Sequence, residues 1–144
     1  MRTKRYVLSG LVLFVVALAW NALLHLVLLR RAHAAVQHLL RPDFQEKAWL
    51  TLVVTAGMIA VFVWGYRRFV RDASWAEGAR YAFYFGLVAG LLVDLNQYVL
   101  YPIPGWVAAA WFAGGLVEFQ LYAFLLTRLL APAVQRQHRS GLPG

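Results

Sequence analysis

The sequence predicts an all-α fold: a polytopic membrane protein in which four transmembrane helices form an antiparallel bundle. The chain has 144 residues, of which 62% are hydrophobic and 14% are charged, whereas about a quarter of the residues of a soluble domain are charged. Four apolar runs have the length of about 20 residues that a helix needs to cross a bilayer. We therefore expect a single transmembrane domain over residues 1–144.

The composition and the absence of known motifs exclude several classes of function. The chain contains no cysteine, which rules out disulfides and thiolate metal sites. Its net charge is +8, but the basic residues form short clusters at the ends of apolar runs. This pattern is typical of a membrane surface and not of a nucleic-acid-binding stripe. No phosphate-binding glycine loop, dinucleotide fingerprint or hydrolase motif is present, so we expect no nucleic-acid partner, no metal site and no enzyme supported by a motif.

Charged or turn-forming residues separate the four expected spans. The spans cover about residues 6–29, 48–66, 79–101 and 106–130. A polar connection at 30–47 joins the first two, and Pro102 and Pro104 turn the chain sharply between the last two. The polar end at 131–144 is expected to be a flexible tail.

Local signals mark the boundaries of these spans. The first span follows a basic head, as the apolar core of a signal peptide does. The span is longer than such a core, and Arg30-Arg31 follows it in place of a cleavage site, so we expect this span to be retained. Asp43 with Glu46 and Ser74 with Glu77 have the spacing of a capping box, so each pair predicts a helix start.

The distribution of Lys and Arg predicts the orientation. Ten of the 14 lie in the head, in the connection between the second and third spans counted as far as Arg80, or in the tail counted from Arg128, and the other four lie at 30–47. Because cytoplasmic segments carry the excess of basic residues, we expect both termini in the cytoplasm and the chain in the cytoplasmic (inner) membrane.

Small residues recur every four positions in the last two spans. Ala82, Gly86 and Gly90 lie on one face of the third span, and Ala110 and Gly114 on one face of the fourth. Small residues let helix backbones approach closely in membranes. Because a short turn makes these spans antiparallel neighbours, we expect both stripes to be packing faces that can meet each other.

Polar residues extend these stripes into two candidate sites. From the helical rise of about 1.5 Å per residue, Asp94 lies roughly 10 Å inside the outer boundary and Glu118 about 18 Å, near the bilayer middle. The outer candidate site is a polar cluster of Asn21, His25, Asp94, Gln97 and Tyr98. The deeper one is Glu118 with Tyr122 or Gln120, as a proton or ion site or as a contact between helices.

Each of these residues also has a structural interpretation. Asn21 and Gln97 have the side chains that commonly hydrogen-bond between membrane helices, and a single histidine such as His25 is weak evidence for a ligand. Carboxylates inside a membrane cost a few kcal/mol, so for Asp94 and Glu118 a functional and a structural role carry equal weight. The remaining histidines of the polar connection, His33 and His38, are expected to be solvated.

Three functions compete on this basis. The first is a subunit or scaffold of a membrane assembly, with bilayer lipid and other membrane subunits or further copies of the chain as partners. The second is a minimal oligomeric transporter or ion-coupled carrier that uses Glu118 and Asp94. The third is a membrane enzyme, or a cofactor- or lipid-binding protein, that uses His25 and Asp94. The sequence indicates no particular cofactor, substrate or oligomeric state.

Overall fold

The computed structural model describes residues 2–71 and 74–140, with side chains for residues 4–71 and 74–130. Every regular element in these ranges is helical, which confirms the all-helical part of the prediction. Four helices are long and apolar enough to cross a membrane by length and composition: Lys4–Leu28, Phe44–Phe69, Trp75–Leu100 and Gly105–Leu130. Membrane crossing and an antiparallel four-helix bundle stay predictions.

Two of the long helices contain a π-helical turn. The elements in chain order are α1 (Arg2–Ala22), the π-helix η1 (Leu23–Leu28), α2 (Arg30–Val36), the 3-10 helix η2 (Gln37–Leu39), α3 (Phe44–Phe69), α4 (Trp75–Gly90), the π-helix η3 (Leu91–Leu95), α5 (Asn96–Leu100) and α6 (Gly105–Ser140). α6 passes Pro132 and continues beyond the predicted end at 130. Residues 141–144 of the predicted tail lie outside the described residues.

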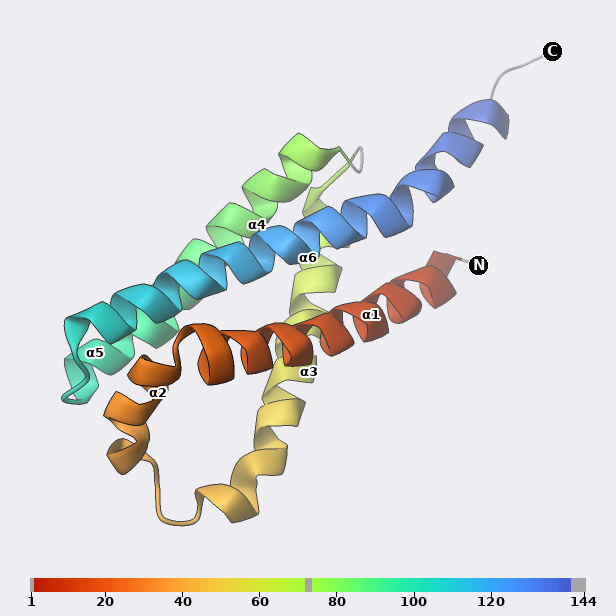
Figure 1. Cartoon of the computed structure of the whole chain (residues 1–144). Coiled ribbons are helices and arrows are strands. Elements are labelled where there is room, and N and C mark those ends of the chain that lie inside the picture. The colour runs from red at the N-terminus through yellow and green to blue at the C-terminus, as the bar shows by residue number, and fades with distance from the viewer. Residues whose placement is uncertain (1, 72–73, 141–144) are drawn as a thin grey trace.

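α4 and α6 form the most extensive contact between helices. They run side by side in opposite directions and are joined by the short turn after α5 (Figure 1). α1 lies along α6, whereas α3 crosses α1 instead of following it (Figure 1). The start of α1 and the end of α6 lie toward the same side of the molecule, opposite to α2 (Figure 1).

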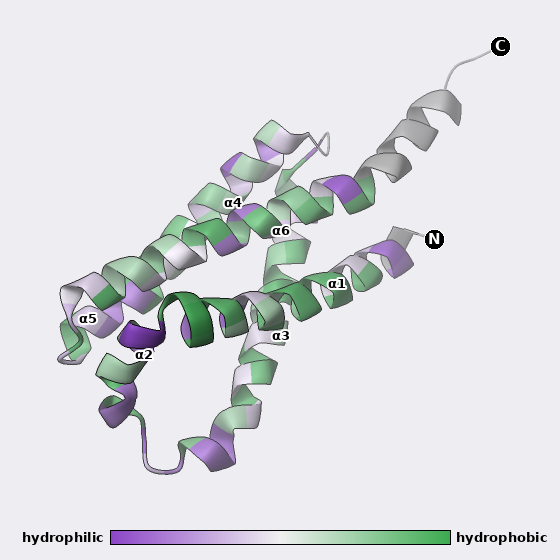
Figure 2. Cartoon of the chain, viewed as in Figure 1, coloured by the Kyte–Doolittle hydropathy of each residue, from purple (hydrophilic) through white to green (hydrophobic). Residues whose placement is uncertain are grey.

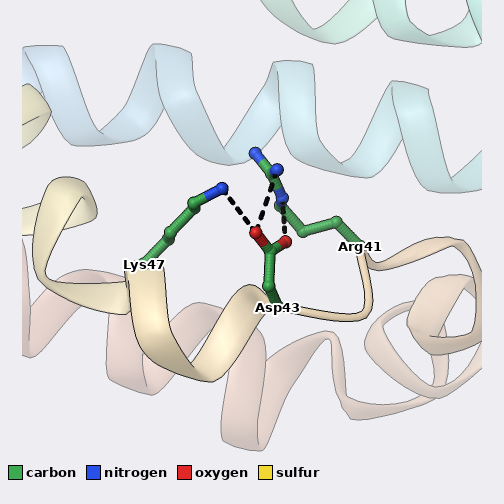
Figure 3. Close-up of polar contacts among 3 residues, drawn as sticks. All are labelled: Arg41, Asp43 and Lys47. Atoms are coloured by element: carbon green, nitrogen blue, oxygen red, sulfur yellow. Dashed lines mark hydrogen bonds and ion pairs between the residues drawn. The ribbon is translucent and has the colours of Figure 1, made fainter.

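One of the two predicted helix starts forms a cap. The backbone N–H of Glu77 donates to the Ser74 hydroxyl at 3.3 Å, as predicted. Asp43 occupies the N-cap position of α3 but makes no capping bond. Its carboxylate pairs instead with Lys47 and Arg41 (Figure 3), and hydrogen bonds from these two cations lower the pKa of Asp43 below its usual value.

The small residues of α4 pack against large residues of α6. A Cβ added to Gly86 would lie 3.0 Å from Phe119, and one added to Gly90 would lie 2.5 Å from Phe112. Ala82, one turn before Gly86, is fully buried. The missing side chains therefore leave the space that the α6 side chains fill.

The small residues of α6 face a different helix. A Cβ added to Gly114 would lie 2.8 Å from Leu24 of η1, and Ala110 is half-buried. The structure thus differs from the expectation that the two small-residue stripes meet each other. Large side chains of the neighbouring helices fill the space beside each small-residue stripe, which gives the close packing that protein interiors have.

Two apolar clusters hold the helices together. The larger cluster joins α1, α3, α4 and α6 around Phe62, which is fully buried and meets the rings of Phe85 and Tyr122 edge-on, with centroids 5.1 and 5.7 Å away. The smaller cluster joins α2 to the start of α6 through Val36 and Val107. Along α1–α2 and along α6, the residues between the two clusters line the cavity described below.

Apolar side chains also cover the outer surface. Figure 2 shows hydrophobic residues along α1, α3, α4 and α6, and hydrophilic residues on α2 and its connection to α3. None of residues 44–58 in α3 is buried, and Val54 is 69% exposed. Exposed apolar surface on this scale marks an interaction with lipid or with another protein.

Candidate functional site

A cavity of about 420 Å³ lies between the two apolar clusters. It is bounded by α1 and η1, by the middle of α3, by α4, η3 and α5, and by α6. Five of the predicted polar residues line it: Asn21, His25, Asp94, Gln97 and Glu118. The rest of its wall is mostly apolar and includes the rings of Trp111 and Phe119. The structure therefore brings residues of both candidate sites into one cavity.

Glu118 is the buried carboxylate of this cavity. Its side-chain oxygen Oε1 accepts hydrogen bonds from Asn21 Nδ2, at 3.1 Å, and from the hydroxyl of Tyr122. Tyr122 is fully buried, so its hydroxyl is fixed on this oxygen. The other oxygen, Oε2, accepts no hydrogen bond from the described part of the chain, and it therefore keeps the capacity to hold a proton or a ligand.

Asn21 connects the first helix to α6. Its Nδ2 also donates to the carbonyl oxygen of Ala17 at 2.9 Å, so both amide protons are used. Asn21 was grouped with Asp94 in the predicted outer cluster, whereas in the structure Asn21 bonds to Glu118. Gln120, the other expected neighbour of Glu118, donates instead to the carbonyl oxygen of Ala79 at 3.1 Å.

Asp94 is half-buried and is not bonded to another described side chain. Its Oδ2 lies 3.9 Å from the position of a Cβ on Gly115, so the carboxylate reaches α6 about one turn before Glu118. Among the residues with described side chains, no Lys or Arg lines the cavity. The two carboxylates consequently share the cavity without a fixed positive charge.

The two π-helical turns carry His25 and Asp94. In η1 the N–H of Leu29 donates to the carbonyl oxygen of Leu24, five residues earlier, at 2.6 Å. In η3, Asp94 lies within the π-turn Leu91–Leu95. π-turns inside α-helices are rare and occur frequently at functional sites, and here both lie at the same cavity.

Tyr98 is the predicted cluster member that lies elsewhere. It is 50% exposed, and its ring lies 3.7 Å from the position of a Cβ on Gly105. A stripe with strict four-residue steps rotates by about 40° per step, because a helical turn has 3.6 residues. By Tyr98 the stripe that begins at Ala82 has turned away from the cavity, and Gln97 lines it instead.

The imidazole of His25 lies among other rings. Its centroid is 6.3 Å from that of Trp111, edge-on, and 6.5 Å from that of His33. His33 is half-buried and not fully solvated as expected, whereas His38 is exposed. No hydrogen bond joins His25 to Asp94 in the residues that the structure describes.

Trp111 is the residue of the cavity wall that the sequence did not single out. Its indole Nε1 is buried and has no hydrogen-bond partner among the described residues. A tryptophan in an apolar run suggests only packing or a membrane boundary. Its distance from the end of the helix gave a signal, because Trp111 lies further into the last span than a boundary residue would.

The polar side chains that line the cavity determine which ligands it can bind. Two carboxylates and the amide of Gln97 supply oxygen acceptors, and Trp111 supplies an aromatic wall. Within the described side chains no group of three or more His, Asp or Glu residues could hold a metal ion. The arrangement suits a proton or a cationic ligand, because aromatic faces and carboxylates both attract positive charge.

The fold and the cavity together define a class: a small all-helical protein with four long apolar helices that line a cavity containing two carboxylates. No family model, curated protein or solved structure matches the chain. Function is therefore inferred from the geometry of the cavity.

Proposed function

We propose that the protein is a multi-pass protein of the cytoplasmic (inner) membrane with both termini in the cytoplasm. The apolar side chains exposed along the long helices support this location, because lipid tails would cover them. The excess of Lys and Arg in the head, the second connection and the tail supports the orientation. The polar cavity would then lie within the bilayer.

We further propose that the cavity binds a small organic cation in exchange for protons, so that the protein acts as a proton-coupled carrier. Two carboxylates, Asp94 and Glu118, line a single cavity of about 420 Å³, and no described Lys or Arg side chain lines it. This observation carries the proposal. Intramembrane carboxylates are costly and mark ion and proton pathways, and the charge of such a pair is offset by bound protons or by a bound cation.

The size and walls of the cavity favour an organic cation over a bare metal ion. A volume of about 420 Å³ is much larger than the roughly 30 Å³ that one water occupies, and it falls within the range of small-molecule pockets, about 300–1,000 Å³. The ring of Trp111 offers the aromatic face that quaternary ammonium groups bind. Asp94 and Glu118 Oε2 would supply the negative charge.

Transport by proteoliposomes tests this function. We expect the purified chain to couple an outward proton gradient to the uptake of tetraethylammonium. Asp94→Asn should abolish this uptake, because the variant keeps the shape of the side chain and loses its charge. Tyr98→Phe, outside the cavity, is the matched control and should transport normally. Uptake that is equal in wild type, Asp94→Asn and empty liposomes would rule out the carrier.

A second candidate function is a subunit of a membrane assembly. The observation that favours it is the first half of α3, where none of residues 44–58 is buried and the helix lies apart from α2 (Figure 1). A partner helix could pack there. The mass of the protein isolated gently in native membrane discs tests this second function. Isolation together with other chains in fixed stoichiometry would support a subunit of an assembly. Isolation of the chain alone or as a homo-oligomer would contradict it.

A further inference from the structure

A second cavity lies between α1 and α3 and shares no residue with the polar cavity. Its volume is about 500 Å³. Its wall is formed by apolar side chains of both helices and by the small residues Gly10, Ala56 and Ala60. We call it the α1–α3 groove. Of the side chains that the structure describes, Arg67 is the one charged group that lines it.

Arg67 lies at one end of the groove, close to the start of α1. Its guanidinium carbon is 5.2 Å from the centroid of the Tyr6 ring, so the start of α1 and the end of α3 meet there. In the part of the chain that the structure describes, no carboxylate forms an ion pair with Arg67. Arg67 is exposed, and its guanidinium makes this end of the groove basic.

We propose that the α1–α3 groove binds an anionic phospholipid, with one acyl chain along the groove and the phosphate at Arg67. The groove is apolar along its length and basic at one end, which matches the charge pattern of this ligand. Arg binds phosphate through two parallel hydrogen bonds. The basic end is the one that the orientation proposed above places in the cytoplasmic leaflet, where anionic lipids create a negative surface potential.

The chemistry of the groove disfavours a second copy of the chain as its occupant. Two copies related by a two-fold axis present the same surface to each other. Two copies with the same membrane orientation are related by an axis along the membrane normal, so such a contact through the α1–α3 groove would bring the basic ends of both grooves together. Like charges at an interface are repulsive, whereas a phosphate neutralises them.

Gly10 allows the groove to be filled without a clash. Gly10 lines the groove, and a Cβ added to it would meet nothing within 4 Å, so we expect the side chain of Gly10→Leu to occupy the groove. Gly57 on α3 is equally open but does not line the groove. Gly57→Leu is therefore a matched control for the added bulk and hydrophobicity.

Native mass spectrometry of the detergent-solubilised full chain tests the site. The probes are phosphatidylglycerol and phosphatidylcholine with identical acyl chains. We expect wild type and Gly57→Leu to retain phosphatidylglycerol in preference to phosphatidylcholine, and Gly10→Leu to lose it. Arg67→Gln should reduce the preference about fivefold, the factor that corresponds to about 1 kcal/mol per basic residue at an anionic surface. Unchanged helicity in circular dichroism shows that each variant is folded.

Three results would overturn the proposal. The first is equal retention of the two lipids by wild type. The second is an equal loss in Gly10→Leu and Gly57→Leu, which would show that the groove is not involved. The third is a dimer that Gly10→Leu alone abolishes, which would show that a second copy occupies the groove. The proposal rests on membrane embedding but not on ion binding, because lipid retention is measured without transport.

Discussion

Replacing Glu118 by Gln or by Ala separates its charge from its hydrogen bonds. In the structure Glu118 Oε1 accepts from both Asn21 and Tyr122, whereas Oε2 accepts from neither. The amide oxygen of Glu118→Gln can accept the same two bonds, and its NH₂ group takes the place of Oε2. We expect this variant to lose proton-coupled transport and to keep its free energy of unfolding within about 0.5 kcal/mol of wild type, because its structural bonds persist.

Glu118→Ala removes both bonds. Hydrogen bonds between membrane helices contribute about 0.6 kcal/mol each on average, and the buried Tyr122 hydroxyl is left without its acceptor at a further cost of about 1–3 kcal/mol. We expect a total loss of about 2–4 kcal/mol from these principles. Unfolding in mixed detergent micelles, with transport measured on the same preparations, provides the assay. If Glu118→Gln unfolds as readily as Glu118→Ala, the hydrogen bonds to Oε1 do not account for the structural role of Glu118. If Glu118→Gln transports like wild type, the assignment of Oε2 to ligand or proton binding is wrong.

Three further predictions concern the core, an exposed ion pair and the orientation. Phe62→Ala should lower the free energy of unfolding by about 3–5 kcal/mol, since it empties the centre of the aromatic cluster. Unfolding in mixed detergent micelles measures this change. A decrease in the free energy of unfolding of less than about 1 kcal/mol would contradict the packing described. The carboxyl of Asp43 should titrate below its usual value of 3.8 in nuclear magnetic resonance spectra, and Lys47→Ala should raise its midpoint. Because the pKa of Asp43 is lowered in the folded state, the stabilisation by this carboxylate is present above the unfolded pKa and is lost as the pH falls through the folded pKa. If Lys47→Ala leaves the titration midpoint of Asp43 unchanged, the pairing with Lys47 is refuted. Since the chain lacks cysteine, single introduced cysteines can report its orientation in the membrane. An impermeant maleimide should label Gln45→Cys in intact cells and Ala76→Cys only after permeabilisation. The reverse labelling pattern would show that the proposed topology is inverted.

The length and hydropathy of the apolar runs were sufficient to predict the four long helices. The predicted third span, 79–101, corresponds to Trp75–Leu100, and the predicted fourth, 106–130, to Gly105–Leu130. Ser74 was also correctly predicted as a cap, because its bond forms within four residues. These features depend on composition or on local geometry, which a single sequence contains.

The pairing of side chains between helices could not be predicted in the same way. A stripe of small residues indicates a close contact but not its partner, so the contact of Gly114 with Leu24 was missed. The bond between Asn21 and Glu118 depends on how far α1 is shifted along α6, which the spacing within either helix does not determine. The π-turns at η1 and η3 leave no mark in the hydropathy pattern, because they change the hydrogen-bond register and not the composition.

Side chains with competing partners were the other source of differences. Asp43 has the right position for a cap, but two flanking cations bind its carboxylate. Trp111 was overlooked because a tryptophan in an apolar run usually indicates packing. It lines the polar cavity because α6 packs against η1 and α5, and the sequence does not show this arrangement. Both cases depend on neighbours that are absent from the local pattern.

Proton release on ligand binding tests the central claim most directly. Tetraethylammonium is added to the purified protein in weakly buffered detergent solution, and the pH is followed with a soluble dye. If Asp94 and Glu118 exchange protons for an organic cation, wild type releases protons in a saturable manner and a variant with both Asp94→Asn and Glu118→Gln releases none. Equal release by the two proteins, or none by wild type across the range from pH 5 to 8, would contradict a cation–proton exchange site in this cavity.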